Sequence, residues 1–475
     1  MNSDKAQPSP SLAKFHKRWK KNRDFLSGRD AVICAGQAYL QKPSARMSDS
    51  DYDAFKETVG FFPGALSVLA GWIGLIFRDE PDLIAPDALT NLEQIVTRDG
   101  DSLEEFSRAV VRETFITNWT GILDDHPEMP NDPTLNAANA LDRGLRPYLA
   151  MFPAESILDV EYGVVKNQRA FVYVRLLENA KKVLEYRLVD GVCSVETSNF
   201  TDGQWTSHIS FPTQNGKTLD FIPFNIVTTN QSKYPTPSAF EHMVDLNCDI
   251  LNIEGLMAQA SRYVANPIVT ASNIEPLTNS DGTQVQREWA YGPGIVWEIQ
   301  GDAKIDVTEI DGSGLTSLQQ RLDEKKSQLA RTGARILQDD KAAAEAVETV
   351  IIRQTSDNAR LSGMARVIAR QIQNALRTMA WWLGEDRNSV SFELNYDYTE
   401  HKFDKEALDI LVAADQAGWV SDEIIYHYLT RPGGLIDSAV TFDEWKSQLE
   451  SKTLSIPSAG LSFQVPTDTT GGNAQ

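Results

Sequence analysis

The chain has 475 residues, 41% of them hydrophobic, and a formal net charge of −21 at pH 7. The length suggests about three domains, and the composition allows a sizeable core. The charge argues against a protein that grips nucleic acid by neutralising phosphates, but it allows one past which nucleic acid slides. The three cysteines, Cys34, Cys193 and Cys248, lie far apart and follow no secretory leader, so reduced thiols in a cytosolic compartment are expected.

A dense basic cluster follows residues 1–10, which are expected to be disordered. Cations interleaved with aromatic residues are typical of a surface that contacts nucleic acid or an acidic partner. The alternative, which we favour, is a solvated helical face whose aromatic side chains pack inward. The cluster consists of Lys14, Lys17, Arg18, Lys20, Lys21, Arg23 and Arg29, with Phe15, Trp19 and Phe25 between them.

Residues 61–77 carry no charged side chain and could be mistaken for a membrane span. A bilayer needs about 20 apolar residues, and this stretch is shorter and contains proline and glycine. A buried helix is therefore predicted, with no membrane partner. Further on, Ser102 and Glu105 predict a capping box at the start of a helix.

Four acids near this helix could be imagined as metal ligands. They lack the spacing of a calcium loop, so surface carboxylates and no metal site are predicted. The four are Asp99, Asp101, Asp124 and Asp125.

From Pro147 to about Thr229 the apolar period changes from 3.6 to 2, which predicts a mostly antiparallel β section. Pro235 and Pro237 end it. Ser238 is predicted to cap the next helix, with Glu241 in the capping-box position. Helices over 238–263 and 314–337 flank a turn-rich stretch, 264–313. Their similar lengths predict an antiparallel pair that carries a compact module at its far end.

The stretch Ala343–Gly384 contains no proline and one interior glycine. Its apolar residues recur at steps of three and four, so it predicts a helix roughly 60 Å long. A strand over 390–398, helices over 403–417, 421–430 and 442–450, and a disordered tail from 456 follow. The predicted buried face of the long helix is Leu361, Ala365, Ile368, Ile372, Leu376, Met379 and Leu383.

The sequence carries no phosphate-binding loop, HExxH, CxxC or GxSxG motif. Its six histidines are scattered singly, and Trp381-Trp382 is better explained by packing than by stacking on a ligand. No catalytic residue, cofactor or enzymatic activity is predicted.

Several stretches, in this order, resemble the portal proteins of tailed bacteriophages, in a family long catalogued only as a domain of unknown function. They are Gly71–Pro81 (GWIGLIFRDEP), Gly100–Phe106 (GDSLEEF), Thr120–Asp125 (TGILDD), Arg146–Leu149 (RPYL) and Gly333–Leu337 (GARIL), followed by the long helix. The resemblance spans most of residues 10–450.

The resemblance implies an α+β portal fold and a dodecameric ring at one capsid vertex of a virion assembled in the host bacterial cytoplasm. The ring would be the DNA channel for packaging and ejection of the viral genome. The implied regions are a wing (1–237, β-rich from about 147), a first stem helix (238–263), a clip (264–313), a second stem helix (314–337), a tunnel loop with the long helix and a returning wing strand (338–400), and a crown (401–455).

The resemblance also implies partners and sites. The partners would be double-stranded DNA, the terminase large subunit, the major capsid and scaffolding proteins, and a head-completion or tail adaptor. The tunnel loop would hold Gln338, Asp339, Asp340 and Lys341, and clip docking would use Asn279, Asp281, Gln284, Arg287 and Trp289.

Residues 314–337 carry five basic residues against two acids in an otherwise acidic chain. We predict that this helix lines the channel with Arg321, Lys325, Lys326, Arg331 and Arg335. Leu315, Leu318, Leu322 and Leu329 fix a packed face, and at ~100° per residue adjacent Lys325 and Lys326 cannot both share it. Alternatively, both lysines lie on the outer surface and pair with Asp323 or Glu324 of a neighbouring subunit.

Two other classes remain open from the residues alone. One is a hydrolase that acts on a polymer with a carboxylate acid/base pair, which requires a concave site with paired acids. The other is a nonviral oligomeric scaffold built from the same helices.

Overall fold

The computed structural model describes residues 5–127, 143–214, 216–265, 268–272, 277–278, 284–285, 302, 304–308, 313–333, 347–398, 421–430 and 441–453. The chain divides into two compact units, Met1–Tyr398 and Thr399–Gln475. Helices and antiparallel strands build the described part, in agreement with the predicted α+β class.

The N-terminal part of the first unit is helical, and its caps are readable in the sequence. The predicted capping box is present: Ser102 Oγ accepts from Glu105 N at 3.2 Å, and the Glu105 carboxylate accepts from Ser102 N at 2.9 Å. Ser48 Oγ likewise accepts from Asp51 N at 3.1 Å. The helices are α1 Pro10–Ser27, α2 Arg29–Ala35, α3 Asp49–Thr58, α4 Gly64–Ile76, α5 Asp87–Thr90 and α6 Leu103–Thr117, with 3-10 turns η1 Gly36–Ala38 and η2 Glu93–Ile95.

The uncharged stretch 61–77 contains α4, and Val68, Leu69 and Trp72 of this helix are buried in the largest core cluster. This is the buried helix that the sequence predicts. Within the described ranges, we find no helix with the length and apolar character that a membrane crossing requires.

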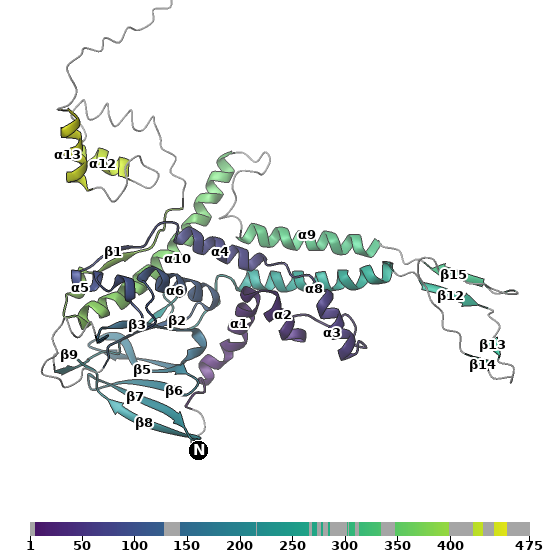
Figure 1. Ribbon diagram of the computed structural model, residues 1–475, viewed down its shortest axis with the longest axis horizontal. Coiled ribbons are helices and arrows are strands. Elements are labelled where there is room, and N and C mark those ends of the chain that lie inside the picture. The colour runs from purple at the N-terminus through teal and green to yellow at the C-terminus, as the bar shows by residue number, and fades with distance from the viewer. Residues whose placement is uncertain are drawn as a thin grey trace, which may run out of the picture. The chain divides into compact units, whose positions relative to one another are not determined.

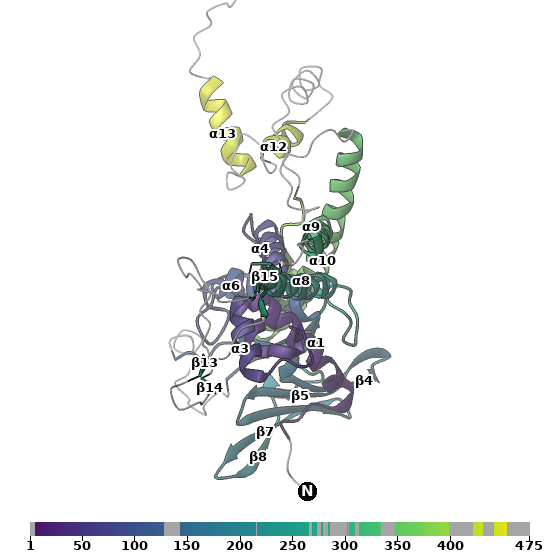
Figure 2. The same ribbon diagram turned by 90° about the vertical axis from the view of Figure 1, so that its right-hand side faces the viewer.

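Two antiparallel sheets form the β part of the first unit. The five-stranded sheet has the order β4-β5-β6-β7-β8, with β4, β5, β7 and β8 labelled in Figure 2, and the smaller sheet has the order β11-β2-β3. Two-residue turns with positive φ at both positions close three of the hairpins, the geometry that matches the twist of paired strands. These turns are Lys166-Asn167, Asp190-Gly191 and Asp202-Gly203.

The strands of the larger sheet are β4 Ile157–Val165, β5 Gln168–Asn179, β6 Lys182–Val189, β7 Val192–Thr201 and β8 Gln204–Ser210. Those of the smaller sheet are β2 Thr120–Asp125, β3 Tyr148–Phe152 and β11 Phe224–Val227. The 3-10 turn η3 Ala154–Ser156 links β3 to β4, and the short pair β9 Thr213–Gln214 and β10 Lys217–Thr218 follows β8.

The predicted long helix is present as α10, Val347–Trp382. Six of the seven residues of its predicted buried face, Leu361 to Met379, are at most 1% exposed, and Leu383 packs against the same core. After the turn η4 Arg387–Ser389, strand β16 Ser391–Glu393 pairs with β1 Asp82–Ile84, more than 300 residues earlier in the chain. Residues near the end of the first unit thus pack into the same core as residues near its beginning.

The predicted helix–module–helix unit is also present. α8 Glu241–Ala265 and α9 Ser313–Gly333 lie side by side, and β12 Ile268–Ser272 pairs antiparallel with β15 Lys304–Thr308 between them in the chain (Figure 1). A second pair in this module is β13 Leu277–Thr278 and β14 Gln284–Val285.

The predicted capping box at Ser238 is wrong. α8 begins at Glu241, three residues later, and Ser238 Oγ accepts from Phe240 N at 3.2 Å. The Glu241 carboxylate instead pairs with Arg18 of α1 at 2.8 Å. A tertiary ion pair therefore takes the carboxylate that the local pattern assigned to the cap.

In the second unit, α12 Asp422–Thr430 and α13 Phe442–Thr453 are described. The Tyr426 ring packs against Phe442 and Trp445, with centroid distances of 5.4 and 5.6 Å. The helix predicted over 403–417 and the tail from 456 lie outside the described residues.

Candidate functional site

The paired helices α8 and α9 bring together most of the described site residues that the sequence predicts. Leu322 and Leu329 of α9 are buried against three apolar residues of α8, namely Leu246, Ile250 and Ile253. α9 also approaches α4 closely: a Cβ at Gly333 would collide with the Val68 side chain. The leucine stripe of α9 is therefore its packed face, as predicted.

Both channel lysines are ion-paired within the subunit. Lys325 Nζ lies 2.7 Å from Asp249, and Lys326 Nζ lies 3.0 Å from Glu254, both on α8. Lys326 also lies over the Phe62 ring, 5.2 Å from its centroid. Both lysines thus have acidic partners on α8 of the same subunit, whereas the alternatives derived from the sequence gave them DNA or acids of a neighbouring subunit as partners.

The physical reason is the position of the two lysines beside the stripe. At ~100° per residue, positions 325 and 326 lie about 50° to either side of its centre. A lysine with a four-carbon stem at that angle reaches the neighbouring helix. The expectation that one lysine must point well away from the stripe is therefore wrong.

Arg321 and Arg331 remain on the solvent face of α9. They lie ~90° and ~170° from the centre of the leucine stripe. Both are exposed, and neither forms an ion pair within the described ranges. Asp323 and Glu324, the two acids of the helix, are exposed as well.

Other predicted site residues are only partly covered by the structure. Gln284 lies in β14. Arg335, the tunnel-loop residues 338–341 and four of the clip residues, Asn279, Asp281, Arg287 and Trp289, lie outside the described residues.

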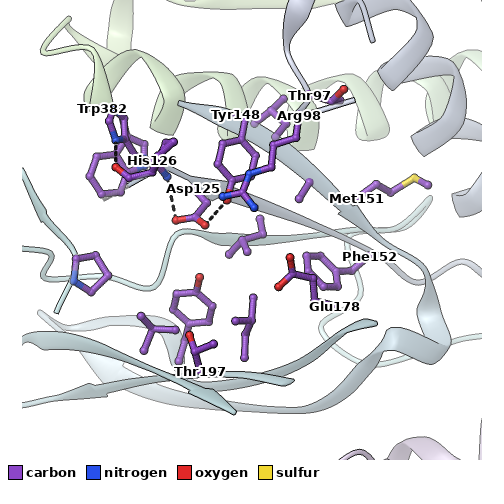
Figure 3. Close-up of a pocket in the computed structure, with 18 of the residues that line it drawn as sticks. Thr97, Arg98, Asp125, His126, Tyr148, Met151, Phe152, Glu178, Thr197 and Trp382 are labelled. Carbon is purple, nitrogen blue, oxygen red and sulfur yellow. Dashed lines mark hydrogen bonds between the residues drawn. The ribbon is translucent and has the colours of Figure 1, made fainter. Parts of the chain in front are cut away.

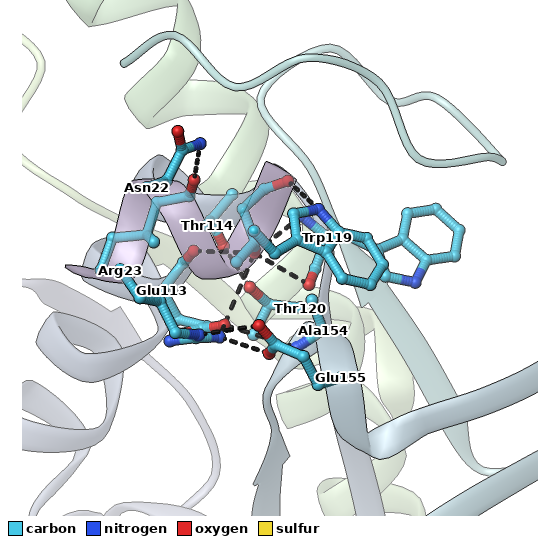
Figure 4. Close-up of polar contacts among 11 residues, drawn as sticks. Asn22, Arg23, Glu113, Thr114, Trp119, Thr120, Ala154 and Glu155 are labelled. Carbon is cyan, nitrogen blue, oxygen red and sulfur yellow. Dashed lines mark hydrogen bonds and ion pairs between the residues drawn. The ribbon is translucent and has the colours of Figure 1, made fainter. Parts of the chain in front are cut away.

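Some cations of the basic cluster are ion-paired inside the chain, and Figure 4 shows Arg23, the residue with two carboxylate partners. Arg23 pairs with Glu113 of α6 and with Glu155 of η3: Nη1 donates to Glu113 at 2.8 Å and Nε to Glu155 at 2.9 Å. Burial alone would lower the pKa of Arg23, but its hydrogen bonds to the two carboxylates raise it above the ordinary value. Lys21 likewise pairs with Asp245 at 2.6 Å.

Trp19 and Phe25 between these cations are each 1% exposed. The alternative that the sequence favours, a helical face whose aromatic side chains pack inward, describes these residues.

A cavity of about 880 Å³ lies between the two sheets (Figure 3). Asp125 and Glu178 line it, together with His126, Tyr148 and Trp382. Asp125 accepts hydrogen bonds from the Tyr148 hydroxyl and from His126 N, and Glu178 is ion-paired with Lys182 at 2.6 Å. Both carboxylates thus have partners within the chain.

Asp124 corrects the prediction of surface acids. It is 1% exposed because β2 is the central strand of its sheet. One carboxylate oxygen accepts from Asn225 Nδ2 at 3.1 Å, and the other has no hydrogen-bond partner. Burial raises the pKa of Asp124 well above its ordinary value, against the opposing effects of Asn225 and Arg387.

We expect Asp124→Asn to stabilise the protein increasingly as the pH rises. The folded pKa of Asp124 lies above the unfolded value of about 3.9. Between these two pKa values the folded state holds a proton that the unfolded state has released. Raising the pH across this range therefore lowers the stability of the wild-type protein. Urea denaturation between pH 4 and 8 should show a gap between variant and wild type that widens with pH. The exposed Asp99→Asn is the control, and a gap that does not change with pH would contradict the assignment.

Among the described residues, no group of three or more His, Cys, Asp or Glu side chains is placed to hold a metal ion. Trp381 and Trp382 pack against the second core cluster, where the Trp381 ring lies 5.2 Å from that of Phe221. Packing is thus the role that the structure gives this pair.

Comparisons with known proteins give a match to a family model and distant structural matches. A family model described as "Domain of unknown function (DUF4055)" matches residues 239–383, which run from the start of α8 to the end of α10. No curated protein matches the chain.

Among solved structures, a chain of "Neck of empty GTA particle computed with C6 symmetry" has 12% identity and a TM-score of 0.37, covering 84% of this chain and 99% of that one. A chain of "Neck of native GTA particle computed with C12 symmetry" has the same identity and TM-score and covers 84% and 97%. Likenesses this distant carry no argument about this chain.

Proposed function

We propose that this chain is the subunit of a portal-type connector, a ring at one capsid vertex through which double-stranded DNA enters and leaves a virus particle. The observation that carries the proposal is the antiparallel pair α8–α9 with a β module at its far end, followed by the long helix α10. The family model covers these same elements. The stretches that resemble portal proteins, from Gly71–Pro81 to Gly333–Leu337, also support the proposal through the order in which they occur.

The charges suit a conduit. A channel must pass many phosphates, so tight basic contacts would retard the DNA. A subunit with a net charge of −21 repels DNA over about a Debye length, ~8–10 Å in physiological salt. Arg321 and Arg331 on the solvent face of α9 would then hold passing DNA weakly, while Lys325 and Lys326 fasten α9 to α8.

The remaining roles belong to the same proposal. The module between α8 and α9 would dock the terminase large subunit and later a head-completion or tail adaptor, and the β part would contact the major capsid and scaffolding proteins. The ring would have twelve subunits and no enzymatic activity of its own, and it would be part of the virion.

Negative-stain electron microscopy of the purified protein tests the proposal. We expect a ring with a central hole and a mass that is a large multiple of 52.8 kDa by light scattering. A strict monomer would refute the connector, and an oligomer without a hole would refute it in favour of the nonviral scaffold.

Two double variants separate the roles of the α9 cations. Arg321→Ala with Arg331→Ala should leave ring formation intact but change the amount of nuclease-protected DNA, because both cations face solvent. Lys325→Ala with Lys326→Ala should mainly destabilise the α8–α9 pair, by about 0.2–1 kcal/mol per ion pair, seen as a lower dissociation temperature of the ring. Unchanged DNA packaging at every salt concentration in the arginine variant would eliminate α9 as the channel lining.

A further inference from the structure

A cluster of cations and tyrosines lies exposed where the β4–β5 hairpin meets the segment before α8. This cluster, the tyrosine–arginine patch, consists of Tyr162, Val164, Arg169, Lys233 and Tyr234. Val164 and Tyr234 are 78% and 56% exposed, and Val164 is the cross-strand partner of Arg169. Exposed apolar side chains gathered around cations are typical of a surface that a partner covers.

The patch is held rigidly before any partner arrives. The Tyr162 ring stacks on Phe171, with centroids 4.6 Å apart, and Phe171 packs at 5.6 Å on the buried Phe224. Arg169 lies over the Tyr162 ring at 5.4 Å and donates to the Tyr234 hydroxyl at 2.9 Å. A cation fixed in this way loses little conformational entropy when an anion binds.

Neither cation of the patch has a carboxylate partner among the described residues. Lys233 lies over the Tyr162 ring at 5.6 Å. Within the described ranges, neither Lys233 nor Arg169 forms an ion pair, whereas Lys166 on the adjoining turn is paired with Asp220. The chemistry that would complete the patch is therefore an anionic surface with an apolar area beside it.

We infer that the tyrosine–arginine patch docks on an acidic surface of a second copy of this chain, the neighbouring subunit in the ring. The inference rests on the proposed function. Each copy carries a net charge of −21, so contact between copies brings acidic surfaces together, and cations at the contact offset that repulsion. In a cyclic ring each interface joins two different surfaces of the chain. One of these surfaces can therefore carry the cationic patch and the other the acidic residues.

Nucleic acid fits the patch less well. Two cations would neutralise only about two phosphates, while the rest of the acidic subunit would repel the polymer. A protein surface, by contrast, also covers Val164 and Tyr234.

The test is a charge reversal, Arg169→Glu with Lys233→Glu, in the full chain. The matched control, Lys181→Glu with Lys217→Glu, makes the same charge change at exposed lysines of the same β part that form no ion pair within the described ranges. We expect the patch variant to need at least roughly tenfold more protein for ring formation than the control, by mass photometry. Arg169→Ala with Lys233→Ala should fall between them, and circular dichroism melts should match in all variants.

The outcomes separate the two proposals. Wild-type protein that forms no ring overturns both. Rings of the patch variant that form at the same concentration as those of the control overturn only the docking inference. Unchanged assembly with lost binding of a fluorescent 30-base-pair duplex would identify nucleic acid as the occupant, and would also overturn it.

Discussion

Ile368→Asp should prevent the first unit from folding normally. Ile368 is 0% exposed at the centre of α10, in the largest core cluster. The substitution removes about 1.5–3 kcal/mol of apolar transfer energy and places a carboxylate where no partner is available, which adds several kcal/mol. Since whole domains are stable by only about 5–15 kcal/mol, we expect aggregated or unassembled protein on expression and size-exclusion chromatography.

Asn374→Asp is the matched control for this variant. It adds the same negative charge to the same helix, at an exposed position. The control should remain soluble and assemble like wild type. A soluble and normally assembled Ile368→Asp protein would show that another face of α10 is buried.

Arg23→Ala should cost about 3 kcal/mol of the free energy of unfolding, measured by urea denaturation. The change leaves Glu113, only 6% exposed, without its charged partner. Breaking a buried pair costs roughly 3–5 kcal/mol, and the lower end applies because the Arg23 side chain keeps 30% exposure. It also releases Glu155, so the attachment of α1 to η3 weakens.

Lys17→Ala controls for the loss of a cation from the exposed face of α1. It should change the free energy of unfolding by less than about 0.5 kcal/mol. Adding Glu113→Gln to Arg23→Ala should restore more than half of the loss, because the buried group is then neutral. Equal stability of Arg23→Ala and Lys17→Ala would contradict the role given to the pair.

The sequence is most informative where one periodic pattern decides the structure. Leu361, Ile368 and Leu376 repeat at helical spacing without interruption, and tertiary packing buries the face that the pattern indicates. Ser102 and Glu105 satisfy each other across three residues, so their capping box is decided locally.

Predictions from local patterns fail where the partner is distant in sequence. Lys325 and Lys326 have partners 76 and 72 residues away, which no local window contains. The residues next to Asp124 in the sequence suggest a surface acid. Only the pairing of β2 with strands on both sides buries Asp124. The tyrosine–arginine patch joins β4, β5 and the segment before α8, so its members never appear together in the sequence.

The pairing of β1 with β16 has a consequence for synthesis of the protein. Phe392, Leu394 and Tyr398 complete the same core cluster that contains Phe25, Val32 and Leu40. At about 5–20 residues per second, a ribosome needs roughly 20–70 s to make the chain between these two groups. Throughout that interval the helices of the N-terminal part present apolar faces without their cover, so we expect chaperones to bind the nascent subunit. A chain that terminates before residue 390 lacks the residues that close the core, and such fragments should be degraded before they can enter an assembly.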